Sequence, residues 1–469
     1  MAENSYHTIV VGGGIAGLTS AAYLAREGYK VLLIEKNREC GGLVNSFTRD
    51  GFHFDSGVRA LENAGVIFPM LEDLGIQLEM VKSPVSLGIE NEIIHIESLS
   101  SLIEYRELLV RFYPESEAEI DQAIKIILKI MKHMDVLYGI QNPLFKDIIR
   151  DRGFIFGKLL PWLPRFIFTI GKINRMKMPV EDYLETIITN VSLRDIISQH
   201  FFKNTPTFFA LSYFSLYLDY FYPMGGMGKL AEAVENKVAD SGGSIRKDTR
   251  VVEVHPDRCQ LKDDKDMVYK YDHLIWAADL KTLYNLVVTD SLSLKVRNRI
   301  KDTKNRMQKS RGGDSVYTLF LEVDQPVESF QKIAHGHFFY TPLKQGLGKT
   351  HTEELNHLLK NFDKIDKEDV LAWLDKFTRL NTYEISIPVM KDPKLAPPGK
   401  TGLIISFLTE YDLFCKVRKA GWYDEFVSEI EDRVKDVIAD SIFPMLRDNI
   451  LRRFSFTPLD IEKRVGSSE

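Results

Sequence analysis

Residues 7–35 read HTIVVGGGIAGLTSAAYLAREGYKVLLIE, and this stretch decides the fold. The apolar run at 8–11 predicts a short, buried parallel strand. A glycine turn follows, and the alanine-rich segment 15–27 predicts a helix that ends with Gly28 as its C-cap. A second apolar run at 30–34 predicts the next strand. The order strand, glycine turn, helix, strand is that of a βαβ unit.

The spacing of the glycines in this turn is typical of a dinucleotide-binding site. In G-x-G-x-x-G, Gly12 permits a tight turn, Gly14 lets a pyrophosphate approach the backbone, and Gly17 lets the helix pack closely on the strand. The helix N-terminus offers free N–H groups and the positive end of a dipole to phosphates. Glu35 follows Gly17 by 18 residues, where an acid accepts hydrogen bonds from a ribose. A plain βαβ turn without a ligand is the alternative. The strand, helix, C-cap and terminal acid all occur in the order and spacing of a dinucleotide site, which favours the dinucleotide.

The composition is that of an ordinary globular protein. The chain has 469 residues, of which 44% are hydrophobic and 27% charged, and a net charge of −5. This length predicts two domains or interleaved lobes, and the acidic balance argues against a general role in binding nucleic acid. The cysteines Cys40, Cys259 and Cys415 lack metal-ligand spacing, so we expect reduced thiols and no metal site. His335 and His337 alternate on a predicted strand without a third ligand, and we interpret them as ordinary strand histidines.

A second glycine pair and a short strand follow the acid. Gly41-Gly42 indicate another close approach of the backbone, and GFHFDSG at 51–57 predicts a strand between turns. This segment resembles the flavoprotein family of phytoene desaturases, carotenoid cis–trans isomerases and retinol saturases, within the amine-oxidase-like superfamily. In that family these motifs surround FAD. Family members often carry arginine after the glycine pair, where this sequence has Leu43. A guanidinium near the flavin therefore has to come from elsewhere or be absent.

The resemblance continues in two later segments. YPMGGMG at 222–228 precedes a predicted helix at 229–239. This helix and the strands after it resemble the second sequence segment that forms the family's FAD-binding domain. By position, Val251 meets the adenine through its backbone. The turn DPKLAPPG at 392–399 also matches the family. The resemblance implies FAD contacts at Gly12, Gly14, Ile15, Ala16, Gly17, Glu35, Lys36, Gly41, Gly42, Leu43 and Val251.

The resemblance implies an α/β fold, in which a Rossmann-like FAD-binding domain of the GR2-type flavoproteins is combined with an interleaved α+β substrate domain. We expect 1–80, 220–290 and 400–469 in the FAD-binding domain, and 81–219 and 291–399 in the substrate and membrane-associating domain. After the final residues, the family continues with a strand and a glycine-rich helix start that hold the ribityl and pyrophosphate portion. We therefore expect a truncated sequence that lacks this C-terminal part of the cradle.

The segment 146–178 combines aromatic residues, prolines and cations. Between Lys146 and Lys177 there are eight basic and two acidic residues, a local charge of +6. Apolar residues framed by cations are typical of a segment in a bilayer interface, and a basic, partly buried pair of helices is the alternative. We see neither a secretory signal at the N-terminus nor an uncharged apolar run of about 18 residues. We expect a cytoplasmic protein with peripheral membrane contact through this segment.

The resemblance implies hydride exchange between the flavin and a carbon of an apolar isoprenoid or polyene lipid, as dehydrogenation, saturation or cis–trans isomerisation. Tyrosines and phenylalanines at 208–222 predict the wall of a pocket for an elongated apolar ligand, with core packing as the alternative. Asp219 and Tyr220 are our candidates for moving the second proton. Two other functions stay open, an amine-oxidase-type flavoenzyme and a non-catalytic prenyl-lipid-binding protein of the Rab escort or GDP-dissociation-inhibitor type. The intact glycines and Glu35 argue against the binding protein.

Overall fold

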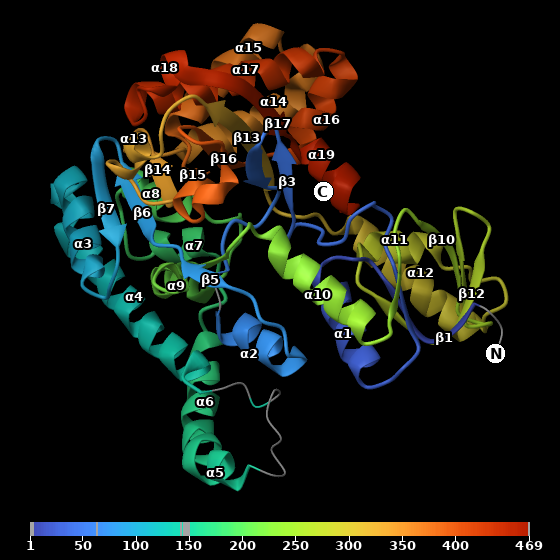
Figure 1. Cartoon of the computed structure of the whole chain (residues 1–469). Coiled ribbons are helices and arrows are strands. Elements are labelled where there is room, and N and C mark those ends of the chain that lie inside the picture. The colour runs from blue at the N-terminus through green and yellow to red at the C-terminus, as the bar shows by residue number, and fades with distance from the viewer. Residues whose placement is uncertain (1–3, 62–63, 141–142, 144–150, 468–469) are drawn as a thin grey trace.

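The computed structural model of the chain describes residues 4–61, 64–140, 143 and 151–467. Its strands form two large sheets in different parts of the molecule, with helices packed around each (Figure 1). The first sheet has six strands in the order β10 (Val251–His255), β11 (Gln260–Asp263), β12 (Val268–Trp276), β1 (Ser5–Val11), β2 (Val31–Ile34) and β9 (Ser244–Arg246). The second has seven, in the order β17 (Ile450–Phe456), β13 (Ser315–Val323), β16 (Thr401–Thr409), β15 (Tyr383–Ser386), β14 (His337–Thr341), β6 (Val85–Ile89) and β7 (Glu92–Ile96). Two small sheets pair β3 (Ser46–Arg49) with β4 (Phe52–Asp55), and β5 (Met80–Lys82) with β8 (Phe221–Pro223).

The first sheet forms around the N-terminal strand. β1 pairs in parallel with β2 and β12, and β2 pairs in parallel with β9. The paired parts of β1 and β2 are buried, which explains their continuous apolar sequence. The helices α1 (Ile15–Arg26) and α10 (Gly228–Asp240) pack together and share a core with these strands. The predicted strand–turn–helix–strand unit and the Rossmann-like α/β fold are therefore confirmed.

The second sheet has its own cores. The nine-residue strands β13 and β16 pair along their whole length, and their apolar side chains share one core with α15, α16 and α17. A separate core joins β6 and β7 to α3, α4, α8 and α9. The helices of these two cores are α3 (Ser101–Phe112), α4 (Glu117–Tyr138), α7 (Val180–Glu185), α8 (Val191–Ser198), α9 (Thr207–Tyr217), α13 (Glu328–Gln331), α14 (Leu355–Asn361), α15 (Lys367–Leu380), α16 (Tyr411–Ala420), α17 (Tyr423–Ser441) and α18 (Leu446–Asn449). The helix α2 (Ala64–Leu74) instead packs in the core of the first sheet. The helices α11 (Leu280–Leu286) and α12 (Leu294–Lys309) follow β12.

The C-terminal segment differs from the predicted domain division. We expected 400–469 in the FAD-binding domain, whereas β16 and β17 are strands of the second sheet. Eight of the nine residues of β16 are buried between β13 and β15, so its apolar sequence is explained by a central position in that sheet. Only α19 (Pro458–Val465) returns toward the first sheet, where the Lys463 carbonyl accepts a hydrogen bond from Lys36 Nζ. The other boundaries stay predictions.

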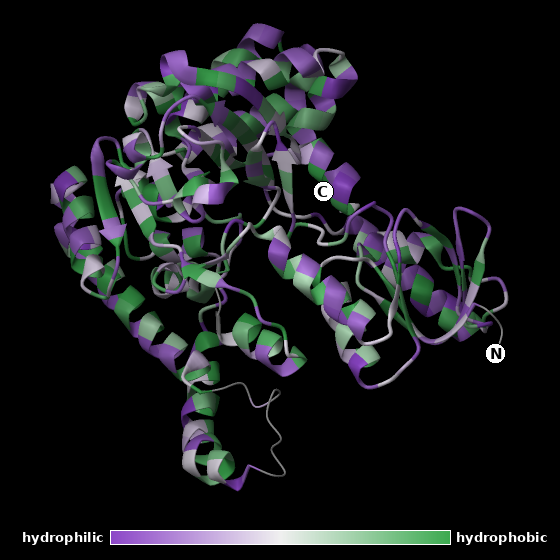
Figure 2. Cartoon of the chain, in the orientation of Figure 1, coloured by the Kyte–Doolittle hydropathy of each residue, from purple (hydrophilic) through white to green (hydrophobic). Residues whose placement is uncertain are grey.

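One helix projects from the molecule, at the bottom of Figure 1. It runs from Arg152 to Ile173 through α5 (Arg152–Phe154), a π-helical turn and α6 (Leu160–Ile173). Within the described part of the chain it is the one helix long and apolar enough to cross a membrane by length and composition, although Lys158 and Arg165 interrupt its apolar run. Only 11% of its apolar window is buried, and Figure 2 shows hydrophobic residues along it. Residues 146–150 of the predicted membrane segment lie outside the described residues.

A buried carboxylate joins segments that run between the two sheets. Asp55, the last residue of β4, is completely buried. Its Oδ1 accepts hydrogen bonds from Ser46 Oγ (2.7 Å) and from the Met227 N–H (2.9 Å), and its Oδ2 accepts one from the Tyr222 hydroxyl (2.7 Å). Phe54, one residue earlier, packs in the core of the second sheet. Asp55 therefore holds the turn before α10 against a strand that is anchored in the other half of the molecule.

Replacing Asp55 with asparagine should lower the free energy of unfolding by about 2–4 kcal/mol, because an amide nitrogen replaces an acceptor oxygen and leaves a buried donor without a partner. Urea unfolding of the purified chain measures this change. The same substitution at exposed Asp50 is the control, and it should cost less than about 0.5 kcal/mol. Equal losses at the two positions would contradict the joining role of Asp55.

Candidate cofactor and substrate site

The two glycine motifs predicted to contact the cofactor lie against each other. The Gly41 N–H donates a hydrogen bond to the Gly13 carbonyl (2.7 Å), and Gly41 also pairs with Gly14 as an isolated bridge. The φ angles are +116° at Gly41 and +61° at Gly42, which favour glycine. The close approach that the sequence indicated at 41–42 is therefore a contact with the first glycine turn.

The N-terminus of α1 offers the space and the free donors that a phosphate needs. Gly14 is the N-cap and has no side-chain cap, so the first N–H groups of α1 stay available. A Cβ on Gly14 would meet no heavy atom within 4 Å, whereas a Cβ on Gly17 would lie 1.9 Å from the Gly12 carbonyl oxygen. Gly17 is thus required for packing, and Gly14 borders open space. Ile15 and Ala16 form the first turn beside that space, which fits a pyrophosphate.

Glu35 is fixed directly beside the glycine turn. It follows β2 and is 7% exposed. Its Oε2 accepts a hydrogen bond from the Gly13 N–H (2.6 Å), and its Oε1 accepts one from the Asn37 N–H (2.8 Å). Oε2 keeps a second lone pair for a donor such as a ribose hydroxyl. The Thr249 N–H donates to the Glu35 carbonyl (3.0 Å), which brings Val251, at the start of β10, to the same corner of the sheet.

Two predicted cofactor contacts have other neighbours in the structure. Lys36 Nζ donates to the Lys463 carbonyl of α19 (3.3 Å), and burial lowers the pKa of Lys36. Leu43 has a side chain that is largely exposed, and its carbonyl accepts a hydrogen bond from the Val58 N–H (3.0 Å). Leu43 thus has only its backbone and an apolar side chain to offer a ligand. Contact of each predicted residue with a cofactor stays a prediction.

A buried guanidinium, which the sequence analysis missed, lies near Leu43. It belongs to Arg59, which is 5% exposed. Its Nη1 donates to the Gly57 carbonyl, its Nη2 donates to Thr318 Oγ1 (3.1 Å) and Ser406 Oγ (2.5 Å), and its Nε has no partner among the described residues. A Cβ on Gly57 would lie 2.4 Å from the Leu43 carbonyl oxygen, so the two segments touch. A buried guanidinium therefore lies close to the segment that follows the glycine pair, at a position two residues beyond Gly57 that no motif marks.

Three more titratable side chains lie near Arg59, namely the buried Lys391 and His337 and the partly exposed Glu384. Lys391 Nζ donates to the Arg59 carbonyl (3.0 Å) and to Ser386 Oγ (2.9 Å), and burial lowers the pKa of Lys391 to about 8. His337 Nε2 lies 3.2 Å from Glu384 Oε1 without the angles of a hydrogen bond, and burial lowers the pKa of His337. Burial alone would raise the pKa of Glu384, but contact with His337 and the charge of Arg59 hold it at about 2. No group of three or more metal-ligating side chains occurs among the described residues.

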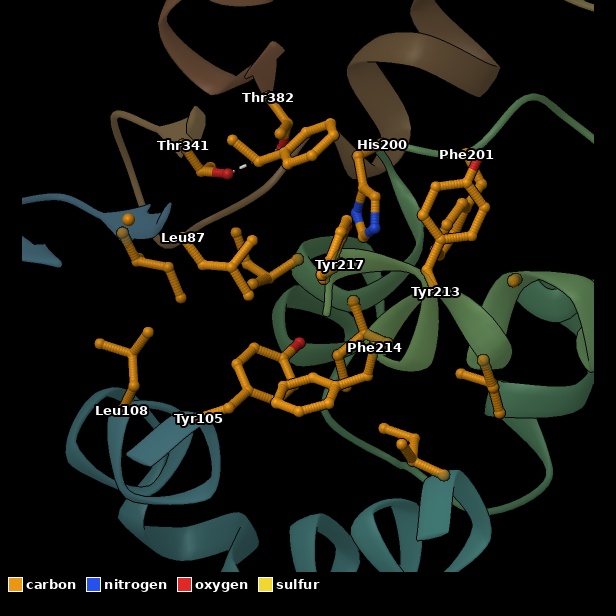
Figure 3. Close-up of a pocket in the computed structure, with 18 residues that line it drawn as sticks. Leu87, Tyr105, Leu108, His200, Phe201, Tyr213, Phe214, Tyr217, Thr341 and Thr382 are labelled. Carbon is orange, nitrogen blue, oxygen red and sulfur yellow. Dashed lines mark hydrogen bonds between the residues drawn. The ribbon is translucent and has the colours of Figure 1, made fainter. Parts of the chain in front are cut away.

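An aromatic cavity lies in this part of the molecule, and Figure 3 shows the residues that line it. Side chains from β6, α3, α4, α9 and β14 line it, among them Leu87, Tyr105, Tyr213, Phe214, Tyr217 and Phe339. None of the described lining residues carries a carboxylate, an ammonium or a guanidinium group. Its volume of about 70 Å³ is below that of a typical small-molecule pocket, so it has room for only part of a long ligand.

The predicted aromatic wall at 208–222 contributes only part of this lining. Tyr213, Phe214 and Tyr217 line the cavity, as the pocket interpretation predicted. Phe209 is largely exposed, and Tyr222 instead binds the Asp55 carboxylate. The remaining walls come from elements that are distant in sequence, and no local pattern identifies them.

A row of aromatic rings connects the cavity with the buried charges. The ring centroids of Tyr217 and Tyr220 are 5.8 Å apart, and those of Tyr220 and His337 are 5.0 Å apart. Tyr220 is 1% exposed, whereas Asp219 is exposed. The structure thus places one of the two proton-transfer candidates between the cavity and the charges, and the other on the surface. Their catalytic roles stay predictions.

Comparisons with known proteins agree with the fold and with the family that the sequence resembles. The model of the family described as flavin-containing amine oxidoreductases matches residues 15–431. The chain is 24% identical to 4,4'-diapolycopene oxygenase from Methylomonas sp, over 100% of this chain and 87% of that protein. It is 21% identical to all-trans-retinol 13,14-reductase from Danio rerio, over 92% of this chain and 68% of that protein. The crystal structure of an oxidoreductase from Methanosarcina mazei matches with a TM-score of 0.62 at 14% identity, over 96% of this chain and 87% of that one. The resemblance predicted from the sequence is confirmed.

Replacing Gly14 with alanine should weaken FAD binding by about tenfold or more, because the new methyl group enters the open space before α1. Its φ of −67° suits alanine, so the free energy of unfolding should stay within about 0.5 kcal/mol of the wild-type value. Gly17→Ala is the matched comparison, and it should cost more than about 2 kcal/mol of stability because its Cβ meets the Gly12 carbonyl. Flavin fluorescence titration and urea unfolding measure the two effects. Unchanged FAD affinity in Gly14→Ala would contradict a phosphate site at the N-terminus of α1.

Proposed function

We propose that this chain, which belongs to the flavin-containing amine oxidoreductase family and is an FAD-dependent oxidoreductase, acts on an apolar isoprenoid or polyene lipid. The glycine turn, the free N–H groups of α1 and the carboxylate of Glu35 fit the dinucleotide part of FAD. The choice of substrate rests on the aromatic cavity, whose described lining residues include no charged side chain.

An uncharged apolar ligand suits this cavity because its walls are aromatic and aliphatic. A protonated amine would lose its hydration there without a carboxylate to pair with, and that loss is costly. The cavity therefore supports a lipid substrate over an amine. Names of similar proteins point the same way, since they include a diapolycopene oxygenase, a phytoene desaturase and a retinol reductase.

When bound, FAD supplies the site that accepts or donates the hydride, and the protein orients the substrate and excludes water. In this proposal Tyr213, Phe214 and Tyr217 hold an apolar chain by ring contacts. The hydroxyl of Tyr220 is the candidate for holding a proton, because this residue is buried between Tyr217 and the His337 ring. Asp219 is a weaker candidate because its side chain is exposed.

The FAD-loaded chain tests the substrate class directly. Under anaerobic conditions, phytoene and all-trans-retinol in detergent micelles are added to the oxidised and to the reduced protein, with putrescine and benzylamine as comparisons. We expect at least one isoprenoid to change the visible flavin absorption and to be desaturated, saturated or isomerised. The amines should leave the flavin absorption unchanged. Reduction of the flavin by an amine and not by any isoprenoid would overturn the proposal. The direction of the flavin change distinguishes dehydrogenation from saturation.

We further propose that the projecting helix at 152–173 lies on an anionic bilayer surface. In α6, exposed apolar residues occur at Leu160, Leu163 and Ile167, spacings of three and four that put them on one helix face, and Phe156 is exposed in the π-helical turn before them. The α6 cations at 165 and 172 are spaced by seven and share another face, roughly 160° away at about 100° per residue. An apolar face with cations opposite is typical of a helix lying in the interface.

Replacing both Phe156 and Ile167 with glutamate should lower co-sedimentation with anionic phospholipid vesicles by about tenfold or more, because each exposed apolar side chain contributes roughly 1.5–3 kcal/mol when buried in lipid. Leu294→Glu is the control, since it places the same charge at another exposed apolar position, at the start of α12. If the double variant binds the vesicles as well as the wild-type chain, or if the control loses as much binding, this helix is not the membrane-contacting segment.

A further inference from the structure

The cavity contains an imidazole that makes no hydrogen bond to any other residue that the structure describes. His200 follows α8, and Figure 3 shows its ring pointing into the cavity among the aromatic side chains. The ring packs against Phe201 (centroids 3.9 Å apart) and Phe339 (5.9 Å), and no hydrogen bond links it to another described residue. Its ring nitrogens are therefore polar atoms without partners in an apolar wall.

Burial keeps this imidazole neutral. It lowers the pKa of His200 to about 3, far below physiological pH. A neutral imidazole has one N–H donor and one nitrogen acceptor. It therefore offers a hydrogen bond to an uncharged ligand and no positive charge to a carboxylate.

The hydroxyl of Tyr105 is a second polar group of this cavity without a hydrogen bond to another described residue. It comes from α3, and Figure 3 shows its oxygen on the side of the ring that faces the cavity. Burial raises the pKa of Tyr105, so the hydroxyl keeps its proton. By contrast, the Thr341 and Thr382 hydroxyls are bonded to each other (2.7 Å), and Gln199 Nε2 donates to Thr382 Oγ1 (2.7 Å). These threonines need no ligand.

We propose that His200, assisted by Tyr105, binds a neutral hydroxyl or carbonyl oxygen at the end of an apolar isoprenoid chain. This inference rests on the proposed function and narrows its substrate class from apolar isoprenoid lipids in general to those that carry a terminal oxygen. A hydrocarbon end would leave the imidazole unpaired in an apolar wall, which costs free energy that a hydroxyl group recovers. A carboxylate is disfavoured because no cation lines the cavity among the described residues. The cavity's volume of about 70 Å³ suits the end of a chain rather than its whole length.

Binding of three matched ligands to the FAD-loaded chain tests the proposal. Geranylgeraniol, geranylgeranoic acid and the corresponding hydrocarbon are compared by displacement of Nile red. We expect the wild-type chain to bind the alcohol about fivefold more tightly than either of the others, the effect of one neutral hydrogen bond. In His200→Phe, which keeps an aromatic ring and leaves Tyr105 in place, the preference for the alcohol should fall to about twofold or less, with the affinity for the hydrocarbon unchanged.

Matched variants separate recognition from misfolding. His357→Phe makes the same change at an exposed position of α14 and should keep the preference for the alcohol. Tyr105→Phe removes one hydroxyl group and should reduce the preference, which provides a second test if His200→Phe does not fold. Equal wild-type affinity for alcohol and hydrocarbon, tighter binding of the acid, or an undiminished preference for the alcohol in His200→Phe would overturn the proposal. Failure of all three ligands to bind would contradict the proposed lipid substrate as well.

Discussion

The buried carboxylate of Asp55 is the interaction on which the joining of the two halves depends. A fully buried negative charge is tolerated only when donors surround it, and Ser46, Tyr222 and Met227 supply them from three separate segments. Those segments are β3, β8 and the turn before α10, so the hydrogen bonds of one side chain set their relative positions. Phe54 carries the same strand into the core of the second sheet. The helix α1 packs on α10, so the glycine turn before α1 is also held in a defined position relative to the second sheet.

Charge is distributed unevenly between the junction of the sheets and the cavity. At the junction, Arg59, Lys391 and Glu384 are brought close together, where low dielectric strengthens their mutual influence. The cavity beyond Tyr220 has no charged side chain among the described residues that line it. This separation gives an apolar ligand a neutral compartment next to a polar one. It is the arrangement expected where a protein must bind a lipid and also control protons at one end of it.

The cavity depends on contacts between elements that are far apart in the chain. Tyr105 lies on α3, Tyr217 on α9 and Phe339 on β14, and they meet because α3, α9 and β6 share one core next to β14. Aromatic residues supply bulk and ring contacts with few rotatable bonds, which suits walls that must keep their shape. His200 enters the same space immediately after α8. A local stretch of sequence therefore describes one wall of the cavity and leaves the others unspecified.

The sequence by itself determined the first βαβ unit, the positions of the close backbone approaches and the family. These follow from local causes, namely apolar periodicity, helix propensity and backbone conformations that glycine adopts at Gly12 and Gly41. Only the tertiary structure decided that β16 and β17 belong to the second sheet, because apolar strands of similar pattern fit either sheet and pairing is non-local. It also decided that Arg59 supplies the buried guanidinium, and that His200 and Tyr105 share a cavity. A side chain's role there depends on which distant segments surround it, and that information is not present in its sequence neighbours.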